Sequence, residues 1–578
     1  MQRHVQVTGN GRRAIALSSH LRIGALAGAM ILVAGAAGQA SADSAPKVTP
    51  LPHNVPNYFR FTYPSSLKAP LPQRGTIGMP LVMTPSQDYI DSKGLLGVGL
   101  TTGAVIPSKN AFFQSLGANG RSCFSCHQPA DGMSLSKSTI QRAFLLTGGR
   151  DPMFAPVDGA NCPSSVPRNE TVVSVLGGLF GGGRQSLRDS HSLLLNKGLF
   201  RVFLPVPTTT QDLSSIGGPP AHDVEFTIDV VKDPYGCNTD KAYAEATEAN
   251  GTETRKMVSV YRRPRMSANL GTIERPALTL GGGGLPNIDF VTGTPVTDVA
   301  TGMPISGNIM WDGREPTLES QAAHATMGHA QAIDPPTKDQ VDQMVAFEKS
   351  VLTAQSYHVL AGDLTRNSAT GGPKPMATAP STFGDFDTYK NWSTTTGSNA
   401  TISDKARASI ARGQALFNKR DITVDNVPGF NNTALLGTTN PATTHCSSCH
   451  GNLPTGSDPF PAGQRDIGIG GAAVAFGGPK PSNDLPVFKV SCKEGFSTPY
   501  YGKEVVTNDP GLALITGKCA DIGRRSVPQL RALAARSPYF SDGSEETLEG
   551  VVKVYNNRFH IGLNAGEITD LANFLAAL

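Results

Sequence analysis

The sequence predicts a mainly α protein built as two related domains with long coil-rich insertions, and three observations predict this fold class. Apolar residues recur with helical spacing over 338–353, 406–418, 547–556 and 566–578, whereas only 224–231 alternates like a strand. Gly and Pro, at 63 and 43 of 578 residues, exceed their usual shares, so much of the chain should be loop. A short motif and a longer segment each occur twice, which indicates duplication.

The first 42 residues have the three parts of a secretory signal peptide. They carry four arginines and no acidic residue, then an apolar run over 23–37, then Ala40-Ser41-Ala42. The run is shorter than the ~20 residues that a membrane span needs, although an uncleaved anchor is the alternative. We expect cleavage after residue 42, a periplasmic or secreted protein with no membrane attachment afterwards, and a compartment that permits disulfides.

The charge balance argues against nucleic acid as a partner. The chain has 50 basic and 46 acidic residues, and four of the basic ones lie in the predicted leader, so the remainder carries 46 of each sign. No run of five Lys or Arg occurs, and no basic stripe contains interleaved aromatics. An electron donor would have to dock on a local patch of charge.

Two identical cysteine motifs predict two covalently attached haem c groups. They are Cys123-Phe-Ser-Cys126-His127 and Cys446-Ser-Ser-Cys449-His450. In Cys-x-x-Cys-His the thiols form thioethers with the porphyrin, and the adjacent imidazole ligates iron from the proximal side. His127 and His450 are therefore the expected proximal iron ligands. A zinc site or plain disulfides are the alternatives.

The four remaining cysteines are expected to form disulfides. Proximity in the sequence favours Cys162 with Cys237 and Cys492 with Cys519, but four cysteines allow three connectivities, and free buried thiols are a further alternative.

A duplicated Asp-Gly turn supports two related units. The segment Met310-Trp-Asp-Gly-Arg-Glu-Pro-Thr-Leu-Glu319 is followed 230 residues later by Phe540-Ser-Asp-Gly-Ser-Glu-Glu-Thr-Leu-Glu549. Each copy reads as a turn that leads into a helix. We predict an N-terminal extension at 43–110, a first haem c domain with insertions at 111–363, a linker at 364–403 and a second haem c domain at 404–578.

These features resemble the di-haem bacterial cytochrome c peroxidase and MauG superfamily. In the first half the resemblance rests on Trp311-Asp-Gly-Arg314 and Thr317-Leu-Glu319. In the second half it rests on four segments: Ala411-Arg-Gly-Gln-Ala-Leu-Phe417, Val527-Pro-Gln-Leu-Arg531, Ser537-Pro-Tyr-Phe540 and the C-terminal helix. It covers most of 400–578, is patchy over 111–345 and leaves 43–110 uncovered.

The resemblance implies roles for residues near the first haem, which would be the one that reacts with peroxide or dioxygen. Trp311 would relay electrons between the haems, unless it only packs in a core. A glutamate some twenty residues beyond this tryptophan serves as the acid and base in the peroxidases, but here that position holds Gln331, whose amide cannot transfer the proton. His329 and His324 lie on the same segment, and either could be a distal ligand, an acid or base, or an ordinary surface histidine.

The second haem would relay electrons and needs a second axial ligand from the C-terminal half. No methionine follows Met376, so we consider His560, which the sequence favours, and Tyr555, which stands where MauG-type relatives supply tyrosine. A family histidine beside the Asp-Gly turn is replaced by Ser541.

Three functions follow from the resemblance. The first is a peroxidase that uses a small redox protein as electron donor. The second is a MauG-like or rubber-oxygenase-like enzyme that oxidises an organic or protein substrate, such as polyisoprene cleaved by dioxygen, since the long-chain rubber oxygenases also lack the glutamate. The third is an electron-transfer cytochrome with no enzymatic activity.

Overall fold

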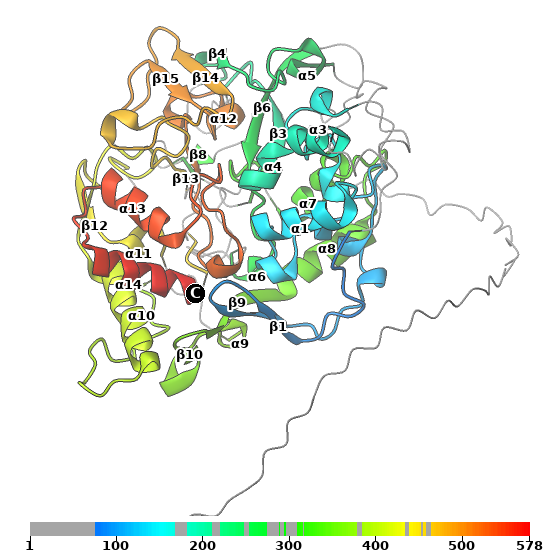
Figure 1. The fold of residues 1–578 in the computed structure, drawn as a ribbon. Coiled ribbons are helices and arrows are strands. Elements are labelled where there is room, and N and C mark those ends of the chain that lie inside the picture. Colours follow the sequence, from blue (N-terminus) through cyan, green and yellow to red (C-terminus); the bar gives the residue numbers. More distant parts are fainter. Residues whose placement is uncertain are drawn as a thin grey trace, which may run out of the picture. The chain divides into compact units, whose positions relative to one another are not determined.

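The computed structural model describes most of the chain after residue 75 (Figure 1). The described ranges are 76–167, 182–210, 220–247, 254–273, 288–289, 294–295, 309–315, 317–378, 384–433, 438–451, 455–457 and 464–578. The predicted signal peptide and residues 43–75 of the predicted N-terminal extension lie outside them. Residues Thr49–Leu578 belong to one compact unit, and everything below concerns that unit.

The expectation of a mainly α fold is wrong, because the described residues form six antiparallel sheets. The largest has the strand order β1-β2-β9-β10, with bounds β1 (Ser86–Ile90), β2 (Gly94–Leu100), β9 (Val351–His358) and β10 (Gly362–Asp363). β2 pairs along its whole length with β9, from more than 250 residues away. β9 begins with five consecutive buried residues, so both of its faces are covered and the alternation that identifies a strand is missing.

The four helices expected from periodicity are confirmed. They are α8 (Lys338–Ser350), α10 (Ile402–Lys419), α13 (Leu548–Arg558) and α14 (Ala565–Ala576). The expected extension of the first to residue 353 is wrong, because Val351 already starts β9 and pairs with Leu100 of β2. The pairing of β9 with β2 therefore ends α8 at Ser350.

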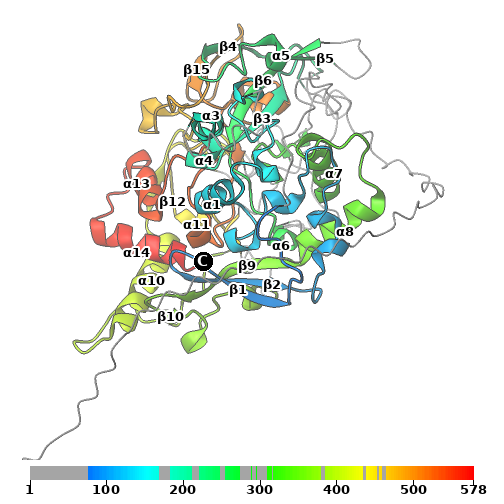
Figure 2. The same cartoon turned by 45° about the vertical axis from the view of Figure 1, so that its right-hand side comes forward.

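Helices α10 and α14 lie side by side, as Figures 1 and 2 show, and both contribute side chains to the cavity beside the second motif. Capping boxes begin both helices, Thr401 with Asp404 and Asn564 with Glu567. Gly413 permits the close crossing, since a Cβ there would overlap the backbone of Asp570. A buried cluster that includes Phe417 and Phe574 fills the contact.

The other regular elements are shorter. The remaining α-helices are α1 (Lys137–Thr147), α3 (Gly182–Ser190), α4 (Ser192–Lys197), α5 (Lys241–Ala244), α6 (Leu270–Ile273), α7 (Leu318–Gly328), α9 (Pro373–Met376), α11 (Cys446–Cys449) and α12 (Ala513–Thr516). The remaining strands are β3 (Phe200–Pro205), β4 (Phe226–Lys232), β5 (Glu245–Thr247), β6 (Thr254–Arg262), β7 (Ile288–Asp289), β8 (Thr294–Pro295), β11 (Ile422–Val424), β12 (Ala442–Thr444), β13 (Gln464–Arg465), β14 (Val487–Cys492), β15 (Glu504–Thr507) and β16 (Arg525–Ser526).

One three-stranded sheet joins segments from both predicted haem domains. The strand expected at 224–231 is confirmed as β4, and its partner is β14 (Figure 1). β15 completes the order β15-β14-β4, and the sheet packs on β3 and β6 through a shared apolar cluster. The predicted domain boundaries stay a prediction, but the two sequence halves contribute strands to the same sheet.

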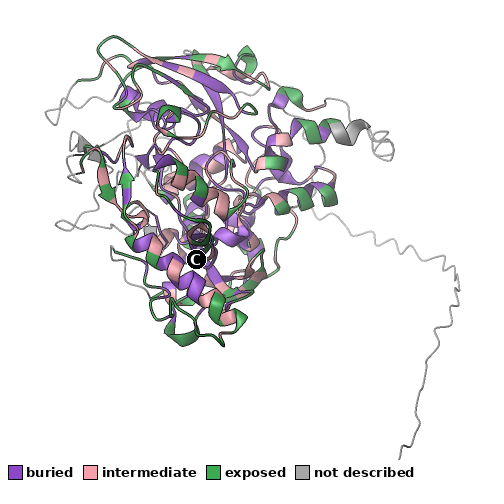
Figure 3. Cartoon of the chain, turned by 60° about the vertical axis from the view of Figure 1, so that its left-hand side comes forward, coloured by how far each residue is buried: buried purple, intermediate pink, exposed green. Residues whose placement is uncertain are grey.

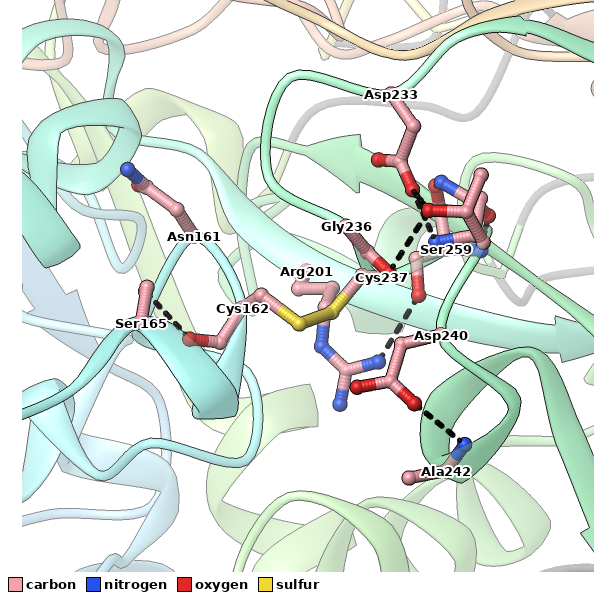
Figure 4. Close-up of a disulfide and its surroundings, with 12 residues drawn as sticks. Asn161, Cys162, Ser165, Arg201, Asp233, Gly236, Cys237, Asp240, Ala242 and Ser259 are labelled. Carbon is pink, nitrogen blue, oxygen red and sulfur yellow. Dashed lines mark hydrogen bonds between the residues drawn. A yellow bond between two sulfur atoms is a disulfide. The ribbon is translucent and has the colours of Figure 1, made fainter. Parts of the chain in front are cut away.

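Both expected disulfides are confirmed. Cys162 is bonded to Cys237 and Cys492 to Cys519. Figure 4 shows the first bridge beside Arg201, whose guanidinium donates to the Ser259 hydroxyl. The first bridge closes a loop of 75 residues and the second a loop of 27.

Buried residues run through the helical and the β-rich parts alike (Figure 3). In the ranges described above, no helix is both long and apolar enough to cross a membrane.

Loss of either disulfide should destabilise the chain. The chain-entropy model gives about 4.5 kcal/mol for the bridge that spans 75 residues and about 3.5 kcal/mol for the bridge that spans 27. We expect Cys162→Ser/Cys237→Ser and Cys492→Ser/Cys519→Ser each to lower the urea midpoint followed by circular dichroism. Unchanged midpoints in both variants would show that the bridges stabilise nothing.

Candidate haem sites

The first motif lies in a short 3-10 turn, Cys123–Ser125, with its thiols buried among apolar side chains. Cys123 Sγ lies 3.7 Å from Met344 Sδ of α8. The Phe112 ring lies 6.5 Å from the His127 ring, centroid to centroid. Both cysteines are free, and burial raises the pKa of Cys126 to about 11. The thiols are therefore protonated at neutral pH and available for thioether formation.

The second motif forms the single turn α11 and lines a cavity of about 220 Å³. Cys446, Cys449 and His450 all contribute to its wall. Most of the other lining side chains are apolar and come from α10, α13, α14 and the segment 525–541. Neither cysteine is in a disulfide here, and burial raises the pKa of Cys446 to about 12.

The two motif histidines are held in the same way. His127 Nδ1 lies 3.0 Å from the Met133 carbonyl oxygen, and His450 Nδ1 lies 3.2 Å from the Gly456 carbonyl oxygen, in each case six residues further along the chain. Because a carbonyl oxygen only accepts, each Nδ1 carries the proton and each Nε2 keeps its lone pair. Burial lowers the pKa of both rings to about 4, so both are neutral at pH 7. A histidine that ligates a metal needs this arrangement.

Five guanidinium groups contribute to the cavity wall. The lining arginines are Arg263, Arg265, Arg465, Arg525 and Arg536. Arg263 donates to the carbonyls of Leu135 and Arg536, and Arg536 donates to that of Gln529. Burial, together with Arg536, lowers the pKa of Arg263 to about 9, because two cations lie close together in a poorly solvated place.

These residues fit haem c. Free cysteine pairs stand next to neutral imidazoles with an available Nε2, while the other four cysteines are bridged. At the second motif an apolar wall suits the porphyrin ring, and the arginines suit its two propionates. Cys446, Cys449 and His450 would hold that haem, and Cys123, Cys126 and His127 the other. In the ranges described above, no group of three or more His, Cys, Asp or Glu side chains is arranged to hold a bare metal ion.

The segment 263–267 connects the two motifs. Its Pro264 carbonyl accepts from Ser134 Oγ, and its Ser267 N–H donates to the Met133 carbonyl, the same oxygen that holds His127. Arg263 to Met266 also line the second cavity. This segment therefore bonds residues next to His127 and forms part of the wall of the cavity at the second motif.

Trp311 lies against this connecting segment and lines the second cavity. Its indole N–H donates to the Arg263 carbonyl at 2.7 Å, and the Arg265 guanidinium lies 5.4 Å above its ring. Its carbonyl accepts from the N–H of Ser526. Trp311 thus lies beside a segment that contacts the residues holding His127 and also lines the second cavity. Its role as an electron relay stays a prediction.

The turn that carries Trp311 is held by a buried ion-pair network. Arg262 bonds Asp312 at 2.6 Å and Asp509 at 2.7 Å, and Asp312 also bonds Arg314 at 2.8 Å. Burial raises the pKa of Asp509, but Arg262 and Arg525 outweigh it, and the pKa lies well below its usual range. Asp312 and Arg314 therefore hold the turn.

His329 lies close to the first motif. It caps the C-terminus of α7, and its carbonyl accepts from the side chains of Asn119 and Arg121, just before Cys123. Its ring is near enough to His127 to lower the pKa of that ring. Its Nδ1 lies 2.6 Å from Asp158 Oδ2.

The other two residues on this segment are placed differently. His324 is buried and its Nδ1 lies 2.9 Å from both carboxylate oxygens of Glu315. The Gln331 carbonyl accepts from the Ala118 N–H, which brings its backbone to the residues before the motif. The role of Gln331 stays a prediction.

The two proposed axial ligands of the second haem differ in location. Tyr555 lines the cavity, with its ring 6.4 Å from that of His450, and burial raises its pKa well above the usual value. His560 is exposed and is absent from the cavity wall. Ser541, at the position of the family histidine, lies in the wall. The geometry therefore favours Tyr555 over His560.

Sequence reasoning missed Asp158 and the connecting arginines. Arg262-Arg263-Pro-Arg265 places three cations in four residues, a local signal that could have been found. Asp158 has no such signal, since only the fold brings it to His329.

Comparisons with known proteins add one remote likeness. No protein-family model and no curated protein matches the chain. A solved structure described as a MauG-like protein associated with microbial copper homeostasis is similar over 54% of this chain and 82% of its own, with 16% identity and a TM-score of 0.23. This likeness is too low to assign a fold or an activity.

Each motif should bind one haem independently. We expect two haems per chain by pyridine haemochrome assay of protein matured in a host that attaches haem c, and one haem in Cys446→Ser/Cys449→Ser. The matched control, Cys492→Ser/Cys519→Ser, removes two other cysteines and should retain both haems. A wild-type protein without haem, or a motif variant that keeps two, would contradict the assignment.

Proposed function

We propose that the chain is an exported di-haem c-type oxidoreductase in which the haem at Cys123 and Cys126 reacts with peroxide or dioxygen and the haem at Cys446 and Cys449 relays electrons. The observation that carries the proposal is the pair of identically held, neutral motif histidines, His127 and His450. Haem c, when bound, supplies the redox chemistry, and the chain's residues supply ligation, insulation and proton transfer.

The surroundings of the two sites support different roles. Near the first motif, His329 presents an imidazole with its Nδ1 bonded to Asp158, so its Nε2 is an acceptor for a proton. Tyr555 lines the second cavity with its ring 6.4 Å from that of His450, and we assign it as the second axial ligand of the haem that would bind there. An anionic oxygen ligand lowers the potential of a haem relative to methionine. The first haem then has an accessible face and the second does not.

Trp311 is assigned as the electron relay. It lines the second cavity and bonds the segment that also contacts the residues holding His127. A small redox protein is the proposed electron donor or acceptor, docking on a local patch because the chain without its leader has no net formal charge.

The proposed location is the periplasm or the exterior. The two disulfides support it, because such bridges persist in oxidising compartments, and haem c attachment to free cysteine pairs fits the same compartment.

A second candidate is oxidation of an organic or protein substrate by the same haem pair, as in MauG-like proteins or rubber oxygenases. The observation that favours it is Gln331, which occupies the position of the peroxidase glutamate and cannot transfer a proton. In this case dioxygen would replace peroxide as the oxidant.

Spectra and turnover of the holoprotein separate these functions. We expect electron paramagnetic resonance to show one high-spin and one low-spin haem, and Tyr555→Phe to remove the low-spin signal while His560→Ala, a control at an exposed site, preserves it. Peroxide consumption with a reduced small cytochrome supports the peroxidase, and oxygen uptake with an organic polymer supports the oxygenase. Two low-spin haems and no turnover with either oxidant would contradict both enzymatic functions.

A further inference from the structure

A buried carboxylate is bonded to the histidine nearest the first motif. Asp158 lies in the coil between α1 and α3 and is 3% exposed. One of its oxygens is 2.6 Å from His329 Nδ1, and the other is paired with Arg121. Arg121 is itself 2% exposed and stands two residues before Cys123. The three side chains form a chain of contacts from the motif to His329.

The segment just before the first motif also holds the backbone around His329. The side chains of Asn119 and Arg121 donate to its carbonyl at 2.7 and 3.3 Å. Gly117 packs so closely on Ala330 that a Cβ at residue 117 would overlap the Ala330 carbonyl. The imidazole can therefore rotate only about its own side-chain bonds, and Asp158 is the group that stops this rotation.

The contact also fixes the tautomer of the ring. A carboxylate accepts hydrogen bonds and donates none, so the proton of the neutral ring is on Nδ1 and the lone pair is on Nε2. The His329 side chain is 42% exposed, whereas that of Asp158 is 4% exposed. The edge of the ring away from Asp158 is therefore the open one, and it carries Nε2.

Arg121 pairs with the Asp158 oxygen that does not bond His329, and burial together with the Arg121 charge lowers the pKa of His329 to about 3. The remaining N–H groups of Arg121 donate to the carbonyls of Pro152, Met153 and Ala155 at 2.8–3.0 Å. A buried cation that is fully bonded stabilises the adjacent carboxylate. A carboxylate behind an imidazole stabilises the cation that forms when Nε2 takes up a proton.

We propose that Asp158, braced by Arg121, is the positioning residue that directs Nε2 of His329 toward the first haem as its proton acceptor. The inference rests on the proposed function, because it requires a haem at Cys123 and Cys126. In the step concerned, the O–H bond of hydrogen peroxide breaks, an N–H bond forms at Nε2, and the electron pair stays on the peroxide oxygen. No electron is transferred in this step, which is a proton transfer only.

Cyanide binding measures this proton transfer without turnover. Hydrogen cyanide binds a ferric haem as the anion and must give its proton to a nearby base. We expect His329→Gln and Asp158→Asn each to slow cyanide association at the first haem of the holoprotein by about 100-fold, the size typical of a lost general base. The double variant should be no slower than either single one, because the two residues act as a unit.

Two controls separate positioning from folding. Asp158→Glu keeps the charge and should restore part of the rate, which a purely structural role would not produce. Asp521→Asn removes a comparably buried carboxylate that is paired with Arg524 and bonded to Thr516, and should leave the rate unchanged. If Asp158→Asn fails to fold, the Asp158→Glu rate and the His329→Gln rate still decide the matter.

The outcomes are distinguishable. A slow His329→Gln with wild-type rates in both Asp158 variants would overturn the role of Asp158 and leave the proposed function intact. Wild-type rates in His329→Gln would remove His329 from the first haem. A protein with no haem at the first motif would instead contradict the proposed function itself.

Discussion

The buried contacts of Arg262 with Asp312 and Asp509 are the interaction on which the arrangement of the two sites depends. Arg262 ends β6, Asp312 follows Trp311, and Asp509 lies beyond β15, so one guanidinium joins three segments that are far apart in the sequence. Removing one partner of such a buried pair typically costs about 3–5 kcal/mol, since a charge is left without compensation. The same contact fixes the turn that presents Trp311 to the second cavity, and so the geometry of the proposed electron path.

Charge explains why the second cavity suits a haem better than a neutral ligand. The chain without its leader has equal numbers of basic and acidic residues, yet five arginines contribute to the cavity wall. Burial lowers the pKa of Arg263 and of Arg536, and repulsion from Arg536 lowers that of Arg263 further, which means that the charged forms are destabilised by their surroundings. Two propionates would relieve that repulsion, so haem attachment should stabilise the fold as well as supply the chemistry.

Local patterns in the sequence predicted what depends on local chemistry. The haem motifs, the four longer helices and the two disulfides were all accessible in this way, because spacing and periodicity determine them. The fold class was not, because β9 is covered on both faces and β4 finds its partner β14 in the other half of the chain. His329 could be named from its position relative to Trp311, whereas its partner Asp158 comes from an insertion with no periodic signal. The preference for His560 over Tyr555 rested on ligand strength alone, whereas the fold puts Tyr555 in the cavity wall and leaves His560 exposed outside it.

The central claim, that Trp311 couples a reactive haem to an electron-relaying one, is tested most directly by the rate of electron transfer between them. The holoprotein with its second haem reduced is mixed rapidly with peroxide, and oxidation of that haem is followed by stopped-flow absorbance. We predict that Trp311→Phe slows this step by at least about tenfold, an added barrier of about 1.4 kcal/mol. Trp392→Phe is the matched control, because it alters the one other tryptophan, which is buried and lies outside the cavity wall. Equal rates in the wild type and both variants would contradict the account.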